Sequence, residues 1–150
     1  MRIKVLPPLV MLAFGLAMYF LAKFLPVGQF SFFGQDGLMW FLLGAAVLVM
    51  FLAIFQFRKA KTTSNPIDLT KTSALVMGGI FQYTRNPMYL AMLMLLLAWG
   101  LRLGNAFNTL LAAGFVYYMN HFQIRFEEGA LEKQFGKPYR LYCKNTRRWF

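Results

Sequence analysis

The feature that most constrains this chain is a series of apolar stretches long enough to cross a lipid bilayer as helices. The segment from Gly37 to Phe57 contains no charged side chain. A helix of about 20 apolar residues spans the hydrocarbon core of a bilayer, where every backbone polar group must be paired within the protein. The chain is therefore predicted to be an integral membrane protein built from helices.

Four such stretches organise the chain into one all-α membrane domain, residues 1–150, with four transmembrane helices. We place the spans at about 7–25, 37–57, 87–103 and 106–124. A polar cytoplasmic loop, 58–86, separates the second and third spans, and a cytoplasmic tail, 125–150, contains an amphipathic helical segment. A secretory signal peptide is the alternative for the first span. Its apolar run is longer than the ~7–15 residues of a signal core, and no small-residue cleavage site follows Leu25.

Composition and charge agree with a membrane location. Hydrophobic residues make up 59% of the chain and charged residues 14%, and the net charge is +11. An apolar chain with this charge is expected to contact anionic lipid headgroups rather than nucleic acid. The single Cys143 excludes an intramolecular disulfide, and the single His121 does not favour a metal site built by the protein.

The distribution of Lys and Arg predicts the orientation. Fourteen of the sixteen lie in the N-terminus, the long loop and the tail, and only Lys23 and Arg102 lie in the two opposite turns. The positive-inside rule then places both termini and the long loop in the cytoplasm. The small size of the chain favours a bacterial inner membrane.

The first polar cluster, Tyr83 to Tyr89, precedes the third span. Asn is a favoured N-cap and Pro is favoured at the first helical position, so Asn86 and Pro87 predict a helix start. A helix start presents free N–H groups, and together with Arg85 it suits a carboxylate or phosphate. The alternative is that Arg85 only anchors the span at the headgroups.

The second polar cluster, His121 to Glu128, closes the fourth span. Helical spacing would place His121, Arg125, Glu128 and Glu132 on one face, with Glu127 beside them. Adjacent carboxylates at a membrane boundary repel each other unless they face a cation, so they suit a positively charged ligand. The alternative is a solvated turn in which Arg125 pairs with Glu128.

A tight turn joins the last two spans, so both polar clusters are expected at the cytoplasmic ends of neighbouring helices. An anion site opposite a carboxylate pair would suit a small zwitterion, such as a cofactor derived from an amino acid.

Four sequence blocks carry a resemblance to a known family. They are Leu75-Val76-Met77-Gly78-Gly79-Ile80-Phe81, Arg85-Asn86-Pro87-Met88-Tyr89, Arg125-Phe126-Glu127-Glu128-Gly129-Ala130-Leu131 and Phe135-Gly136-Lys137-Pro138-Tyr139-Arg140-Leu141-Tyr142. In order and spacing they resemble the integral membrane methyltransferases that include isoprenylcysteine carboxyl methyltransferase and the phospholipid methyltransferases. The resemblance covers roughly residues 62–149.

The resemblance implies an enzyme that transfers a methyl group from S-adenosylmethionine to a lipophilic or small acceptor and releases S-adenosylhomocysteine. It implies these cofactor-binding residues: Leu75, Val76, Phe81, Asn86, Pro87, Met88, Tyr89 and Glu127. Among them, Glu127 is expected to bind the cofactor's amino group. We add Arg85, Arg125 and Glu128 as catalytic residues that orient the substrate or complete the pocket.

Departures from the family pattern concern the acceptor, which is a carboxylate, a thiol or a lipid amine. The family usually has Tyr at Phe81, Arg at Gln82 and Gly at Ala91, and the isoprenylcysteine enzymes have His at Ser73. Gln123 stands near a position where those enzymes place a substrate-binding Arg. These differences leave open whether the activity is altered or lost. The lack of a dedicated base favours a carboxylate or thiolate acceptor over an amine.

Two other functions fit parts of the sequence. One is a non-enzymatic four-helix membrane protein, such as a transporter subunit or an assembly factor. Against a transporter, ionisable groups are rare within the spans. Gly100, Gly104 and Gly114 are compatible with close helix packing or with dimerisation. The other is a basic RNA-binding peptide, which the apolar spans argue against.

Overall fold

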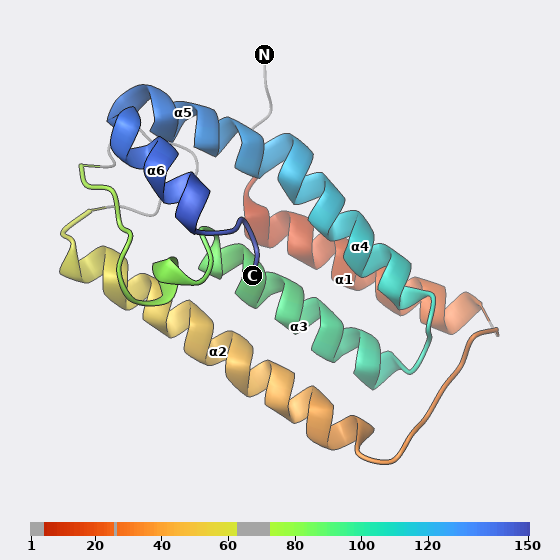
Figure 1. Cartoon of the computed structure of the whole chain (residues 1–150). Coiled ribbons are helices and arrows are strands. Elements are labelled where there is room, and N and C mark those ends of the chain that lie inside the picture. The colour runs from red at the N-terminus through yellow and green to blue at the C-terminus, as the bar shows by residue number, and fades with distance from the viewer. Residues whose placement is uncertain (1–4, 26, 63–72) are drawn as a thin grey trace.

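The computed structural model describes residues 5–25, 27–62 and 73–150, and every regular element in them is helical (Figure 1). The order is α1 (Pro7–Phe24), α2 (Gln35–Lys59), the 3₁₀ helix η2 (Gly79–Gln82), α3 (Pro87–Leu103), α4 (Asn108–Tyr118), the π-helix η3 (Met119–Ile124), α5 (Arg125–Phe135) and α6 (Lys137–Asn145). The predicted all-α fold is confirmed. Part of the predicted loop 58–86 lies outside the described residues.

Two of the four predicted spans have the length and apolarity that a bilayer requires. These are α1, with 18 residues, and α2, with 25 residues. The third, α3, is apolar but has 17 residues, which agrees with the short third stretch in the sequence. Membrane crossing by α3 and by the segment 106–124 stays a prediction.

The fourth predicted span does not end where the apolar residues end. Helices α4, η3 and α5 follow each other without a break, so one long rod runs from Asn108 to Phe135 (Figure 1). Its middle is π-helical, a form that is rare and is often found at functional sites. The predicted tail 125–150 therefore begins as a continuation of the preceding helix.

Helix α3 lies at the centre of the bundle and contacts α1, α2 and α4 (Figure 1). The core between α1, α3 and the α4–η3 rod contains Met18, Leu96, Phe115 and Met119, all almost fully buried. Gly100 and Gly114 permit this packing: a Cβ atom would lie 3.3 Å from Met18 at the first and 3.2 Å from Phe14 at the second. These two glycines therefore serve helix packing within the chain.

The outer faces of the long helices are apolar. In the most apolar 18 residues of each helix, only 17% of α1 and 11% of α2 is buried within the protein. Exposed side chains on α2 include Trp40, Phe41, Val47, Leu48, Phe51 and Phe55. A soluble protein rarely exposes apolar surface over this length, so lipid is the natural solvent for these faces.

The turns at one end of the bundle are joined to each other. Phe30 N–H donates to the Gly104 carbonyl at 2.9 Å, and Ala106 N–H donates to the Gly28 carbonyl at 2.8 Å. Gly104 ends α3 in the left-handed conformation, with φ of 63°, where a side chain is disfavoured. The start of α1, the end of α2, the start of α3 and helices α5 and α6 gather at the other end (Figure 1).

Candidate functional site

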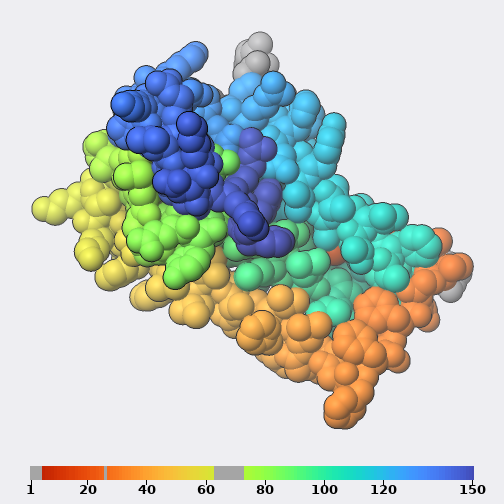
Figure 2. Space-filling model, viewed as in Figure 1, coloured from red at the N-terminus to blue at the C-terminus, as the bar shows by residue number. Residues whose placement is uncertain are grey.

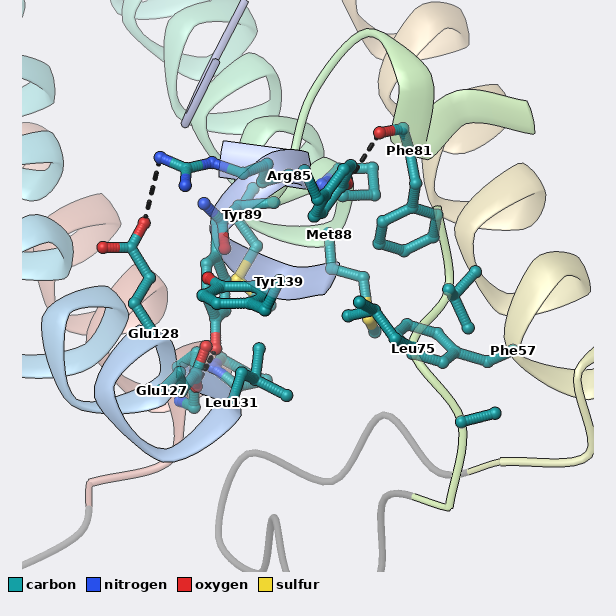
Figure 3. A pocket seen from close by; sticks show the side chains of 18 of the residues that line it. Phe57, Leu75, Phe81, Arg85, Met88, Tyr89, Glu127, Glu128, Leu131 and Tyr139 are labelled. Carbon is teal, nitrogen blue, oxygen red and sulfur yellow. Dashed lines mark hydrogen bonds and ion pairs between the residues drawn. The ribbon is translucent and has the colours of Figure 1, made fainter. Parts of the chain in front are cut away.

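A cavity of about 380 Å³ lies at the end of the bundle where α5 and α6 gather. Its walls come from the start of α1, the end of α2, the segment before η2, the start of α3, and helices α5 and α6. Figure 3 shows the side chains of these elements converging on one space. The cavity volume is in the range of small-molecule sites in proteins.

The segment that leads into α3 forms one wall and is held by α6. Phe81 is buried, and its ring packs edge-on against Phe57 of α2, with 5.2 Å between ring centroids. The Phe81 carbonyl accepts a hydrogen bond of 2.6 Å from the buried Tyr142 hydroxyl. Gly79 starts the turn with φ of +60°, and a Cβ atom there would collide with Gln56. Phe81 stands where the resemblance implies a Tyr, and its ring thus packs against another apolar ring instead of presenting a hydroxyl group.

The start of α3 is where the sequence predicts it, but the capping differs. Pro87 occupies the first turn and the helix begins there. The Asn86 side chain does not cap the helix; its Nδ2 donates to the Arg148 carbonyl at 2.9 Å. Asn86 is thus the N-cap residue of α3, as predicted, although its side chain binds the C-terminal segment and makes no capping hydrogen bond.

Glu127 is one of the two carboxylic acids that line the cavity. Its Oε1 accepts hydrogen bonds from the Tyr89 hydroxyl at 2.5 Å and from Gln123 Nε2 at 2.6 Å. Burial raises the pKa of Glu127 to about 7, although both hydrogen bonds favour the ionised form. The carboxyl group is therefore poised between its two protonation states near neutral pH.

Glu128 lies between two arginines. Arg148 binds it through two atoms, with Nε–Oε1 of 2.9 Å and Nη2–Oε2 of 2.6 Å. Arg85 approaches it through Nη2 at 3.2 Å (Figure 3). The hydrogen bond to Glu128 raises the pKa of Arg148. Glu128 therefore pairs with Arg85 and Arg148, whereas Arg125, the partner in the alternative interpretation, is exposed.

The residues predicted to share the polar face of the second cluster differ in exposure and in helix type. His121 and Arg125 are exposed, whereas Glu128 is directed toward Arg85 at the start of α3. The π-helix η3 changes the number of residues per turn between His121 and Arg125, so simple α-helical spacing does not hold there. Arg125, Glu128 and Glu132 all lie within α5, so the α-helical spacing applies to these three and not to His121.

The resemblance implies that the C-terminal segment contributes to the site, but the sequence does not identify the contacts that this segment makes. Arg85 N–H donates to the Arg147 carbonyl at 2.9 Å, and Trp149 Nε1 donates to Asn120 Oδ1 at 3.0 Å. Figure 2 shows the last residues seated against the α4–α5 rod and the segment leading into α3. Trp149 is therefore held against the α4–α5 rod, whereas Phe150 is exposed. The sequence signals for this segment are the fourth block of the resemblance and the aromatic and basic residues that follow it.

Ten of the eleven predicted site residues line the cavity. They are Leu75, Val76, Phe81, Arg85, Asn86, Pro87, Met88, Tyr89, Glu127 and Glu128. Arg125 is exposed and is not among the lining residues. The two predicted polar clusters do face each other, since Tyr89 contacts Glu127 and Arg85 contacts Glu128.

The cavity has an apolar part and a charged part. Leu75, Val76, Met88 and Leu131 provide apolar wall, and the charged groups of the second part are Arg85, Glu127 and Glu128. Such a space suits a ligand with a flat or apolar portion and a charged portion that carries both signs.

Comparisons with known proteins agree with this picture. The model of the family described as phospholipid methyltransferase matches residues 35–138, more than half of the chain. A 62-residue segment is 48% identical to a protein of Haemophilus influenzae whose description is "Uncharacterized protein", and the match covers 41% of this chain and 98% of that protein. No solved structure matches the chain. The chain belongs to the phospholipid methyltransferase family.

Proposed function

We propose that this protein is a membrane-bound methyltransferase that uses S-adenosylmethionine and methylates a lipophilic acceptor at the cytoplasmic face. The observation that carries the proposal is the convergence of all eight predicted cofactor residues on one cavity, although they come from sequence positions as distant as 75 and 127. Membership of the phospholipid methyltransferase family supports the reaction type.

The residues present fit this cofactor. An adenosine group needs apolar and aromatic surface, which Leu75, Val76 and Phe81 supply. An amino-acid portion needs an acid for its ammonium group, and Glu127 lies in the cavity with one oxygen already oriented by Tyr89 and Gln123. The volume of about 380 Å³ is adequate for a molecule of this size.

When bound, the cofactor supplies an electrophilic methyl group on a sulfonium. The chain's own contribution is to position the two reactants and exclude water, which is most of the catalysis in such a transfer. Glu127, held by Tyr89, binds the cofactor's ammonium group. The apolar walls from α2 and α5 keep water from the reacting atoms.

The acceptor is a nucleophile that takes the methyl group without first losing a proton to a base in the protein. The described residues that line the cavity include no His, Cys or Lys, and of its two acids Glu127 is assigned to the cofactor and Glu128 is paired with two arginines. A carboxylate or thiolate is already nucleophilic, whereas an ammonium group must first lose a proton. Leu6, Pro7 and Pro8 at the start of α1 form an apolar part of the wall, which is suited to the tail of a lipid-like acceptor.

The direct test is methyl transfer in a membrane. The protein, reconstituted in vesicles made from a bacterial lipid extract, is incubated with S-adenosylmethionine labelled on its methyl group. The proposal predicts label in the organic-soluble fraction, and alkali releases it as methanol if the product is an ester but not if the methyl group lies on nitrogen or sulfur.

Two variants make this test specific. Glu127→Ala is expected to abolish the incorporation of label. Glu132→Gln is the matched control, because it removes an acid of the same helix that pairs with Arg140 in an exposed position. Loss of label in the control as well, or incorporation unchanged by Glu127→Ala, would count against the proposed site.

A further inference from the structure

Arg148 does not line the cavity, yet it connects the two walls that carry the charged residues. Its side chain binds Glu128 of α5 with two hydrogen bonds, of 2.9 and 2.6 Å. Its carbonyl accepts hydrogen bonds from Asn86 Nδ2 at 2.9 Å and from Thr84 Oγ1 at 3.3 Å. One residue near the end of the chain thus joins α5 to the start of α3.

The pairing leaves a positive charge on the cavity side. Two guanidinium groups share the single carboxylate of Glu128, and Arg148 holds it in the stronger, two-atom geometry. Arg85 makes one contact of 3.2 Å, and only 13% of its side chain is exposed. Within the described part of the chain, Arg85 Nε is buried without a hydrogen-bond partner. A buried donor without a partner is costly, so an oxyanion at this point would be bound favourably.

The position of Arg85 identifies which oxyanion fits. Glu127 and Glu128 are consecutive residues of α5, and Arg85 contacts the second of them. The ammonium and carboxylate groups of an amino acid are attached to one carbon atom. Because Arg85 and Glu127 line the same cavity, one amino-acid group can present its ammonium group to Glu127 and its carboxylate to Arg85.

We propose that Arg148 is a positioning residue of the site: by neutralising Glu128 from outside the cavity, it leaves Arg85 available to the carboxylate of the cofactor's amino-acid portion. Without Arg148, Glu128 would pair fully with Arg85 and compete with that carboxylate. The inference rests on the proposed function, since it names a subsite for the same cofactor.

The test compares two ligands by calorimetric titration of the detergent-purified full chain. S-adenosylhomocysteine has both the ammonium and the carboxylate group, and its decarboxylated analogue keeps only the amine. We expect Arg148→Gln to weaken binding of S-adenosylhomocysteine about tenfold, the scale of one charge-assisted hydrogen bond, and to change binding of the analogue by less than about twofold. Arg147→Gln is the matched control, because it removes one exposed positive charge from the adjacent residue.

A second variant separates positioning from a purely structural role. In the double variant Glu128→Gln, Arg148→Gln, Arg85 loses the carboxylate that it contacts. We expect the double variant to recover most of the S-adenosylhomocysteine affinity that Arg148→Gln loses. A structural role predicts the opposite, because the double variant removes both partners of the contact. If Arg148→Gln does not give folded protein, as judged by circular dichroism and size exclusion, the double variant and Arg148→Lys are compared with the same two ligands.

The outcomes are distinct. Equal weakening of both ligands by Arg148→Gln, or no weakening of either, would overturn the inference. So would a double variant that binds no better than Arg148→Gln. If the unaltered protein binds neither ligand, the proposed function fails and the inference fails with it.

Discussion

At the scale of single residues, Glu127 combines burial with two hydrogen-bond donors. Tyr89 and Gln123 both donate to its Oε1, and burial raises its pKa to about 7. Only the ionised carboxylate can pair with an ammonium group. We therefore expect the protonation of Glu127 to govern binding of the proposed cofactor near neutral pH.

This leads to a pH prediction for binding. With a pKa of about 7, the ionised fraction of Glu127 rises about tenfold between pH 6 and pH 8. The affinity for S-adenosylhomocysteine, measured by calorimetry, is expected to rise by about the same factor over this interval. In Glu127→Gln the affinity is expected to be low at both pH values. A flat profile for the unaltered protein would mean that Glu127 does not bind the ammonium group.

The same shift has a consequence for stability without ligand. Because the pKa of Glu127 is raised from 4.5 to about 7, the folded state holds the proton more tightly than the unfolded state between these values. The free energy of unfolding should therefore fall as the pH rises from about 4.5 to about 7. The contribution of Glu127 is the difference between the unaltered protein and Glu127→Gln, measured by denaturant unfolding in detergent at several pH values. Parallel curves for the two proteins would contradict this prediction.

At the scale of elements, helix α6 holds the wall formed by η2. The Tyr142 hydroxyl donates to the Phe81 carbonyl at 2.6 Å in a buried position. Tyr142→Phe leaves this carbonyl without its donor and is expected to lower the free energy of unfolding by about 1–3 kcal/mol. Tyr83→Phe is the control, since Tyr83 is exposed. Equal effects of the two substitutions in a denaturant titration would contradict this role of α6.

Local signals in the sequence predicted some elements well. The Asn86-Pro87 pair marked the start of α3, and the uncharged run from Gly37 to Phe57 lies within α2. The family blocks predicted eight residues that meet at one site, and all eight line one cavity, whereas cofactor binding by them stays a prediction. These predictions succeeded because each depends on residues close together in the sequence or on a pattern shared with relatives.

Other features depend on contacts between distant residues and could not be predicted. The partners of Arg148 lie 20 and 62 residues away, so no local pattern indicates that it pairs with Glu128 or binds Asn86. The π-helix η3 interrupts an apolar stretch without Pro or Gly to mark it. Arg125, placed in the site by its motif, is exposed in the structure.

At the scale of the whole molecule, the charge distribution predicts that the cavity end of the bundle faces the cytoplasm. Fourteen of the sixteen Lys and Arg residues lie in segments assigned to that side. The turn that contains Phe33 lies at the opposite end of the bundle from α6 (Figure 1). If the N-terminus and α6 both face the cytoplasm, the chain between them crosses the membrane an even number of times.

The single native cysteine makes this orientation testable. In a Cys143→Ser background, Lys144→Cys and Phe33→Cys each place one thiol at an exposed position, at opposite ends of the bundle. A maleimide that cannot cross membranes is expected to label Lys144→Cys in inside-out vesicles and Phe33→Cys in intact spheroplasts. Labelling of both variants from the same side would contradict four spans with cytoplasmic termini.

The central claim is that the cavity holds an S-adenosyl cofactor through Glu127. The most direct measurement is calorimetric titration of the detergent-purified protein with S-adenosylhomocysteine, in parallel with Glu127→Ala and Asn86→Ala. We expect saturable binding to the unaltered protein, abolished binding in Glu127→Ala and weakened binding in Asn86→Ala. Absence of binding to well-folded protein at millimolar ligand would contradict it and would favour a membrane protein that keeps the family fold without methyltransferase chemistry.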